Sequence, residues 1–102
     1  MARPELRLWL LGPPRVELGS AAIVVDTRKA TALLIYLAVT GQEHSRESLA
    51  AMFWPESDSA HAKAALRRTL SSLRKALNGE WLVIDREHLA VEPAWLDTQA
   101  FA

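Results

Sequence analysis

Five cationic side chains, with no carboxylate among them, fall in the segment AKAALRRTLSSLRKAL at residues 62–77. Arginine can bond bidentately to a guanine edge, Arg and Lys both bind phosphate oxygens, and small residues such as serine let a helix come close to a base. A one-sign surface of this kind is typical of contact with a phosphate backbone and with base edges in a major groove. The alternative is an ordinary solvated helix face.

A helix over residues 62–77 would place these side chains on one surface. At about 100° per residue, Leu66, Leu70, Leu73 and Leu77 share a narrow arc, which predicts a buried stripe. The cations and the two serines of this segment occupy the remaining arcs: Lys63, Arg67, Ser71 and Arg74 on one flank, and Arg68 and Lys75 on the other, with Ser72 at the edge.

The sequence gives little support for a metal site, an enzyme active site or base stacking by tryptophan. The chain has no cysteine, and its three histidines, His44, His61 and His88, lack the spacing of a metal site. The sequence contains no nucleophile elbow, phosphate loop or GxGxxG motif, so we expect no enzyme and no cofactor. The four tryptophans adjoin apolar runs or turns, which favours core packing over base stacking.

Charge and length narrow the class of protein. The 102 residues predict a single domain, and twelve Lys and Arg against twelve Asp and Glu argue against a non-specific nucleic-acid coat. Charge is instead segregated, because residues 78–102 carry five carboxylates against Arg86 alone. No apolar run approaches the roughly twenty residues needed to cross a bilayer, and we expect a cytoplasmic location.

Local patterns predict the elements that surround the basic segment. Residues 6–11, 15–18 and 22–25 are predicted as three short antiparallel strands, the first ending at Gly12 and two prolines. A first helix is expected after an Asp26 N-cap, ending at Gly41, with Tyr36 and Arg28 outward. A second should start at a Ser45 cap and end before Pro55, with Leu49, Met52 and Phe53 inward.

The chain after the basic segment is predicted to form a hairpin. A polar link, residues 55–60, precedes the basic helix and offers Asp58 or Ser59 as its cap, and WLVIDREHLAVEP follows it as two strands. In the closing PAWLDTQAFA, Trp95, Leu96 and Phe101 are apolar and Asp97 can cap a helix, so we expect residues 94–102 to begin a linker to a downstream domain.

These elements predict an α+β fold of the winged helix-turn-helix type over residues 1–93. It would have an N-terminal three- or four-stranded antiparallel sheet, a three-helix core and a C-terminal hairpin wing. In that layout the basic helix enters the major groove of double-stranded DNA, while the hairpin touches the flanking backbone. Lys63, and Arg46 at the start of the second helix, would meet phosphates.

Four motifs carry a resemblance to a known family: LRLWLLGPPRVELG, TRKATALLIYLA, SRESLAAMFWP and LRRTLSSLRKAL. With them, the sequence resembles the OmpR/PhoB-type winged-helix domain, and within it the N-terminal DNA-binding domain of SARP-type transcriptional activators. The resemblance covers nearly the whole chain. It implies a bacterial transcriptional activator that binds tandem, directly repeated half-sites as a tandem dimer and continues into a helical activator domain.

The resemblance also implies roles for single residues. Arg67, Arg68 and Ser71 would reach bases, with Ser72 at their edge, while Arg74, Lys75 and the wing residue Arg86 would contact phosphates. The link between the second and third helices resembles a loop that touches RNA polymerase or its sigma factor. Its residues here are Pro55, Glu56, Ser57, Asp58 and Ser59.

Alternatives stay open at this point. Arg74 can instead pair with a hairpin carboxylate such as Asp85. The whole domain can be a protein-interaction module that docks RNA polymerase or another domain of its own chain, which its zero net charge and the acidic residues beside Arg86 would suit. A third alternative is that the domain is a winged helix that binds RNA.

Overall fold

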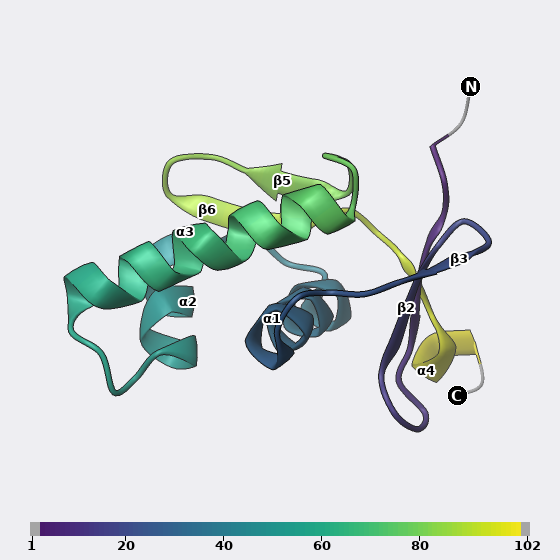
Figure 1. The fold of residues 1–102 in the computed structure, drawn as a ribbon, viewed down its shortest axis with the longest axis horizontal. Coiled ribbons are helices and arrows are strands. Elements are labelled where there is room, and N and C mark those ends of the chain that lie inside the picture. Colours follow the sequence, from purple (N-terminus) through teal and green to yellow (C-terminus); the bar gives the residue numbers. More distant parts are fainter. Residues whose placement is uncertain (1–2, 101–102) are drawn as a thin grey trace.

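Two small sheets pack with three longer helices in the computed structural model, which describes residues 3–100 (Figure 1). The first sheet has the strand order β3-β2-β1-β7 and the second the order β4-β6-β5. The fold is therefore α+β, with four helices in the described residues. The strands are β1 Leu6–Trp9, β2 Arg15–Leu18, β3 Ala21–Ile23, β4 His44–Ser45, β5 Leu82–Ile84, β6 His88–Val91 and β7 Trp95–Leu96.

The first sheet begins with the three predicted strands, although β1 ends at Trp9 and β3 covers Ala21–Ile23 where residues 6–11 and 22–25 were predicted. β1 pairs antiparallel with β2, and β2 pairs antiparallel with β3 across the turn at Gly19. The fourth strand differs from the prediction of an all-antiparallel sheet, because β7 runs parallel to β1 with Arg7 opposite Trp95. A parallel partner comes from a distant part of the chain, and local patterns do not reveal it.

The helices are α1 Arg28–Thr40, α2 Arg46–Phe53, α3 Ser59–Ala76 and α4 Asp97–Ala100. Side-chain caps set the starts of the three longer ones. Ser45 accepts a hydrogen bond from the Ser48 N–H at the start of α2, as predicted, and Asp58, one of the two predicted candidates, caps α3. The expected Asp26 cap is wrong, because Thr27 accepts the Ala30 N–H and α1 starts one residue later.

α3 starts earlier than the predicted helix, at Ser59, because Asp58 satisfies the N–H of His61 in the first turn. The helix then runs eighteen residues to Ala76, and Leu77 is its C-cap. The chain leaves α3 through Asn78 and Gly79, both with positive φ, a conformation that the Asn-Gly pair adopts at low cost.

The core is built mainly from leucines of all the longer elements. The buried leucines are Leu6 and Leu8 of β1, Leu33, Leu34 and Leu37 of α1, Leu49 of α2, Leu66, Leu70 and Leu73 of α3, Leu89 of β6 and Leu96 of β7. The predicted stripe of α3 is thus confirmed, including the buried Leu77.

Two orientation predictions are wrong. Met52 was expected to point inward but is 51% exposed, since the eight-residue α2 buries only the face that carries Leu49 and Ala50. Tyr36 was expected on the surface but is half-buried, with its ring 5.0 Å from His44 and 5.9 Å from Phe53.

The segment expected to begin a linker is structured in its described part. Its residues 95–100 form β7 and α4, and Leu96 is buried against the rest of the core. Phe101 lies outside the described residues. Among the helices within residues 3–100, none combines the length and the apolar character that a membrane crossing requires.

Candidate functional site

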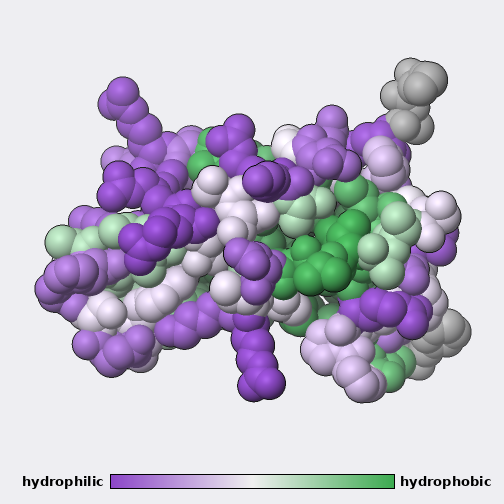
Figure 2. Space-filling view, viewed as in Figure 1, coloured by the Kyte–Doolittle hydropathy of each residue, from purple (hydrophilic) through white to green (hydrophobic). Residues whose placement is uncertain are grey.

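The outer face of α3 is cationic. Lys63, Arg67, Arg68, Arg74 and Lys75 are all exposed, while the leucine stripe holds the opposite face against the core. Ser71 is exposed among them, and Ser72 is half-buried on one flank. Figure 2 shows hydrophilic side chains along α3 on the face seen there, and a hydrophobic group nearer the first sheet.

Ion pairing divides the twelve Lys and Arg side chains by location, all of them within residues 3–100. Four have a carboxylate partner within 4.0 Å, and these are Arg3, Arg7, Arg15 and Lys29. The other eight form no such pair with the described residues. They are the five cations of α3 together with Arg28, Arg46 and Arg86. Arg74 therefore does not pair with Asp85.

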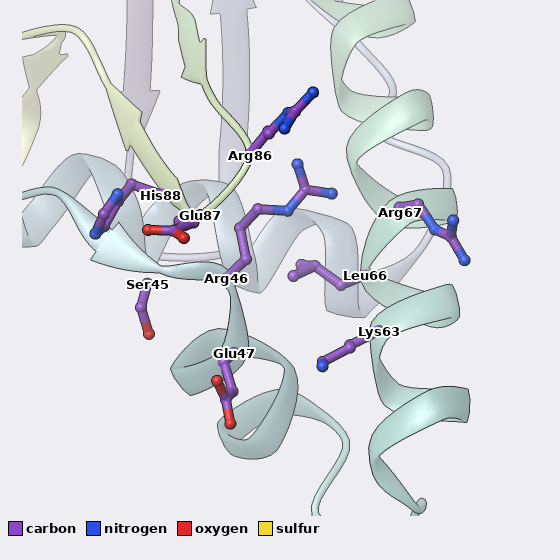
Figure 3. A pocket seen from close by; sticks show the side chains of 9 residues that line it. All are labelled: Ser45, Arg46, Glu47, Lys63, Leu66, Arg67, Arg86, Glu87 and His88. Atoms are coloured by element: carbon purple, nitrogen blue, oxygen red, sulfur yellow. The ribbon is translucent and has the colours of Figure 1, made fainter.

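A groove of about 740 Å³ opens between the first half of α3, the start of α2 and the tip of the β5–β6 hairpin. It brings together Arg46, Lys63, Arg67 and Arg86, which are far apart in the sequence. In Figure 3, Lys63 points from α3 into the groove, and Arg86 extends from the hairpin tip toward α3. Arg67 lies at its edge and points away from it.

Arg46 fixes the hairpin tip to the start of α2. Its backbone N–H donates to the Glu87 carbonyl at 2.7 Å, and its Nη1 donates to the Asp85 carbonyl at 3.0 Å. Its guanidinium is thus partly engaged by the protein, although the group also lines the groove. The structure therefore gives Arg46 a positioning contact in addition to its predicted phosphate contact.

The acidic residues at the tip do not neutralise Arg86. Asp85 accepts the backbone N–H groups of Glu87 at 2.8 Å and of His88 at 2.7 Å, and these bonds hold the pKa of its carboxyl below the usual range. Its carboxylate is thus turned back into its own loop. In Figure 3 the Glu87 side chain points toward His88, away from Arg86.

The groove still contains carboxylates. Glu47 and Glu87 line it beside the four cations, so its fixed charge is a mixture with an excess of positive groups. His88, which also lines it, lies 3.6 Å from both Glu43 and Asp85 through Nδ1. Such a surface can bind an anion with several separated charges, such as a phosphodiester backbone.

Arg68 and Ser72 lie on the other flank of α3, in a second groove of about 450 Å³ beside the start of α1. The predicted base-contacting residues are therefore spread around the helix: Arg67 borders the first groove, Ser71 lies on the exposed face, and Arg68 and Ser72 border the second groove. Arg74 and Lys75 lie in the last turn, exposed and outside both grooves.

The link between α2 and α3, predicted as a polymerase contact, is largely exposed. Pro55, Glu56, Asp58 and Ser59 are exposed and Ser57 is half-buried. Glu56 pairs with Lys29 at 3.5 Å, and Asp58 bonds His61 through both carboxylate oxygens at 2.8 Å. The two carboxylates thus have structural partners while their residues stay accessible.

The sequence-based prediction did not assign Arg28 and Lys29 to the site, and it described Arg28 only as a surface residue. Both line the second groove. A basic pair directly after a helix cap was the available signal, but its proximity to Arg68 depends on how α1 packs against α3. Within the described residues, no group of three or more His, Cys, Asp or Glu side chains could hold a metal ion.

Comparison with protein-family models finds no match for this chain, and neither does a search of curated proteins.

Proposed function

We propose that this chain is the sequence-specific, double-stranded DNA-binding domain of a bacterial transcriptional regulator, an activator by its resemblance. One observation carries the proposal: all eight Lys and Arg side chains that lack an ion pair in the described residues belong to α3 or to the two grooves beside it. Unpaired cations gathered on one side of a neutral chain supply a binding surface for a polyanion.

The dimensions of α3 suit the major groove. A helix is about 10–12 Å across with its side chains, and the major groove of B-DNA is about 12 Å wide. The eighteen residues of α3 extend roughly 27 Å, enough to follow the groove over several base pairs. In this placement Arg67, Arg68 and Ser71 reach base edges, and the half-buried Ser72 is at their margin.

The proposed winged-helix assignment follows from element order. α2 and α3 are consecutive and joined by a short exposed link, and the β5–β6 hairpin comes next and borders the α3 groove with its tip. In a winged helix the second of two such helices reads the major groove, and the hairpin touches the adjacent backbone. Lys63, Arg46 and Arg86 are then phosphate contacts on one flank, and Arg74 and Lys75 contact phosphates from the last turn.

The charge balance predicts how such binding behaves. A neutral domain with one cationic face binds weakly by itself and depends strongly on salt, so a tandem pair on directly repeated half-sites would raise the affinity. The exposed link at residues 55–59 would then remain accessible to RNA polymerase or its sigma factor.

Selection from a random duplex library tests the proposal. The wild-type domain should enrich one motif, and Arg67→Ala with Arg68→Ala should reduce affinity for it by about thirtyfold or more, since good bidentate contacts are worth about 1–3 kcal/mol each. With the five phosphate contacts named above, the logarithm of affinity should fall against the logarithm of salt with a slope of about −4 to −5.

The matched control is Arg7→Ala with Arg15→Ala, which removes the same charge from the first sheet, where each residue pairs with a carboxylate. It should bind the selected motif as the wild type does, and circular dichroism should show all three proteins folded. Equal loss in both double variants would indicate a general charge effect. A library without enrichment would favour the protein-interaction module, and stronger binding to structured RNA than to the duplex would favour an RNA ligand.

A further inference from the structure

The second groove, beside the start of α1, is a cationic surface outside the hairpin side of α3. Arg28 and Lys29 of α1 and Arg68 of α3 line it, with Ser72 at its border and Trp54 in its wall. Lys29 Nζ lies 5.1 Å from the centre of the Trp54 ring, so an aromatic face holds the ammonium at the groove. Arg28 and Arg68 are exposed and form no ion pair with the described residues.

The two grooves lie on opposite flanks of α3. The first uses Lys63, Leu66 and Arg67 of the helix, whereas the second uses Ala65, Arg68, Thr69 and Ser72. At about 100° per residue these two sets point to different sides, with the exposed cationic face between them. A helix in the major groove has one phosphate strand on each flank, since the groove is scarcely wider than the helix.

From this geometry we propose that Arg28 and Lys29, in the groove that the base-contacting Arg68 borders, form a second phosphate-binding site, which holds the DNA strand opposite to the one bound at the hairpin side. This inference rests on the proposed function, because it assigns the second strand of the same duplex. The clustering of three cations from α1 and α3 is its basis. The N-terminus of α1 contributes little to phosphate binding by itself, since the Thr27 side chain already accepts the Ala30 N–H at 3.0 Å.

Two carboxylates limit how strongly this groove can bind phosphate. Asp26 lines it, and Glu56 of the α2–α3 link pairs with Lys29 at 3.5 Å. A phosphate in the groove would compete with Glu56 for the Lys29 ammonium. Removal of the Glu56 charge should therefore strengthen DNA binding, whereas removal of the Lys29 charge should weaken it. Opposite changes in DNA affinity in the two variants would distinguish this groove from a surface that does not contact DNA.

The experiment uses the motif selected for the wild-type domain and compares four proteins. Arg28→Gln with Lys29→Gln should reduce affinity roughly ten- to fiftyfold at 0.1 M salt and make the salt slope shallower by about 1 to 2, because each phosphate contact contributes about 0.9. Glu56→Gln should raise affinity about two- to fivefold. Arg7→Gln with Arg15→Gln, of equal charge change on the first sheet, should leave both the affinity and the slope unchanged.

Ethylation of single phosphates supplies a strand-specific readout. Wild-type binding should be weakened by ethylated phosphates on both strands beside the motif, and Arg28→Gln with Lys29→Gln should lose that sensitivity on one strand only. If the double variant keeps the slope and the interference on both strands, the second groove is overturned while the proposed function stands. If the wild type selects no motif, the proposed function fails, and the inference fails with it.

Discussion

The carboxylate of Asp97, expected only as a possible helix cap, bonds the backbone that follows β1. Asp97 is 3% exposed, and its two carboxylate oxygens accept the N–H groups of Leu10 at 2.8 Å and Leu11 at 2.9 Å. Burial opposes its ionisation, but the backbone N–H groups of Leu11, Leu10, Thr98 and Asp97 together outweigh it and hold the pKa of Asp97 below its usual range. The carboxylate therefore secures the chain directly after β1.

Asp97→Asn should lower the melting temperature at neutral pH, because an amide offers one acceptor oxygen where the carboxylate offers two. A depressed pKa stabilises the folded protein above the unfolded value of about 3.9, and this contribution is lost as pH falls through the folded pKa. The melting temperatures of variant and wild type should thus differ most near pH 7 and approach each other as the pH falls below about 3.9. A constant difference across that range would contradict the role of ionisation.

Single residues also show which contacts can be predicted from the sequence and which cannot. The Ser45 and Asp58 caps were predictable because a cap and its N–H partner lie within three residues of each other. The bond from Arg46 to the Asp85 carbonyl was not, because it joins residues 39 positions apart. The outward orientation of the α3 cations followed from periodicity, but which groove each cation faces follows from the packing of α1, α2 and the hairpin.

At the scale of elements, the β5–β6 hairpin is positioned by α2 more than by α3. Arg46 holds the tip through one backbone and one side-chain bond, and β4, directly before α2, pairs with β6 through His44 and Ser45. The orientation of Arg86 relative to α3 therefore depends on the start of α2. The two-residue β4 was invisible in the sequence, because so short a strand has no pattern of its own.

Arg46→Gln should loosen the hairpin tip without unfolding the domain. It removes the guanidinium bond to Asp85 but keeps the backbone bond to Glu87, so we expect amide hydrogen exchange at the tip to rise about three- to tenfold. Exchange within α1 should not change. Lys75→Gln, which removes an exposed cation in the last turn of α3, is the control. Unchanged exchange at the tip would mean that the hairpin holds its shape alone.

At the scale of the whole molecule, the N-terminal segment is bonded to the second half of the chain on both sides of β1 and along it. β1 pairs with β7, and the segment before β1 contacts Trp81, whose Nε1 donates to the Pro4 carbonyl at 3.1 Å. Arg3 lies 3.9 Å from the centre of that ring and bonds Glu92 at 2.7 Å. These contacts hold Trp81 in a positive-φ conformation that a tryptophan adopts only under constraint.

Leu96→Ala tests whether the segment after residue 93 belongs to the folded unit. Leu96 is 3% exposed within the core, and truncation of a buried leucine costs about 2–5 kcal/mol of unfolding free energy. Val24→Ala is the control, since Val24 is 91% exposed and should cost less than about 0.5 kcal/mol. Chemical denaturation measures both. A small loss at Leu96 would support the predicted boundary at residue 93.

The pairing of β1 with β7 has a consequence for the order of folding. The bond from Leu10 to Asp97 joins residues 87 positions apart, so its loop can close only after Asp97 has been synthesised. During synthesis the β1–β2–β3 meander and the helices can form from nearby residues, but one edge of β1 stays unpaired until β7 emerges. Within residues 3–100, the closure of the first sheet is therefore the last step, after α3 and its cationic face have already been made.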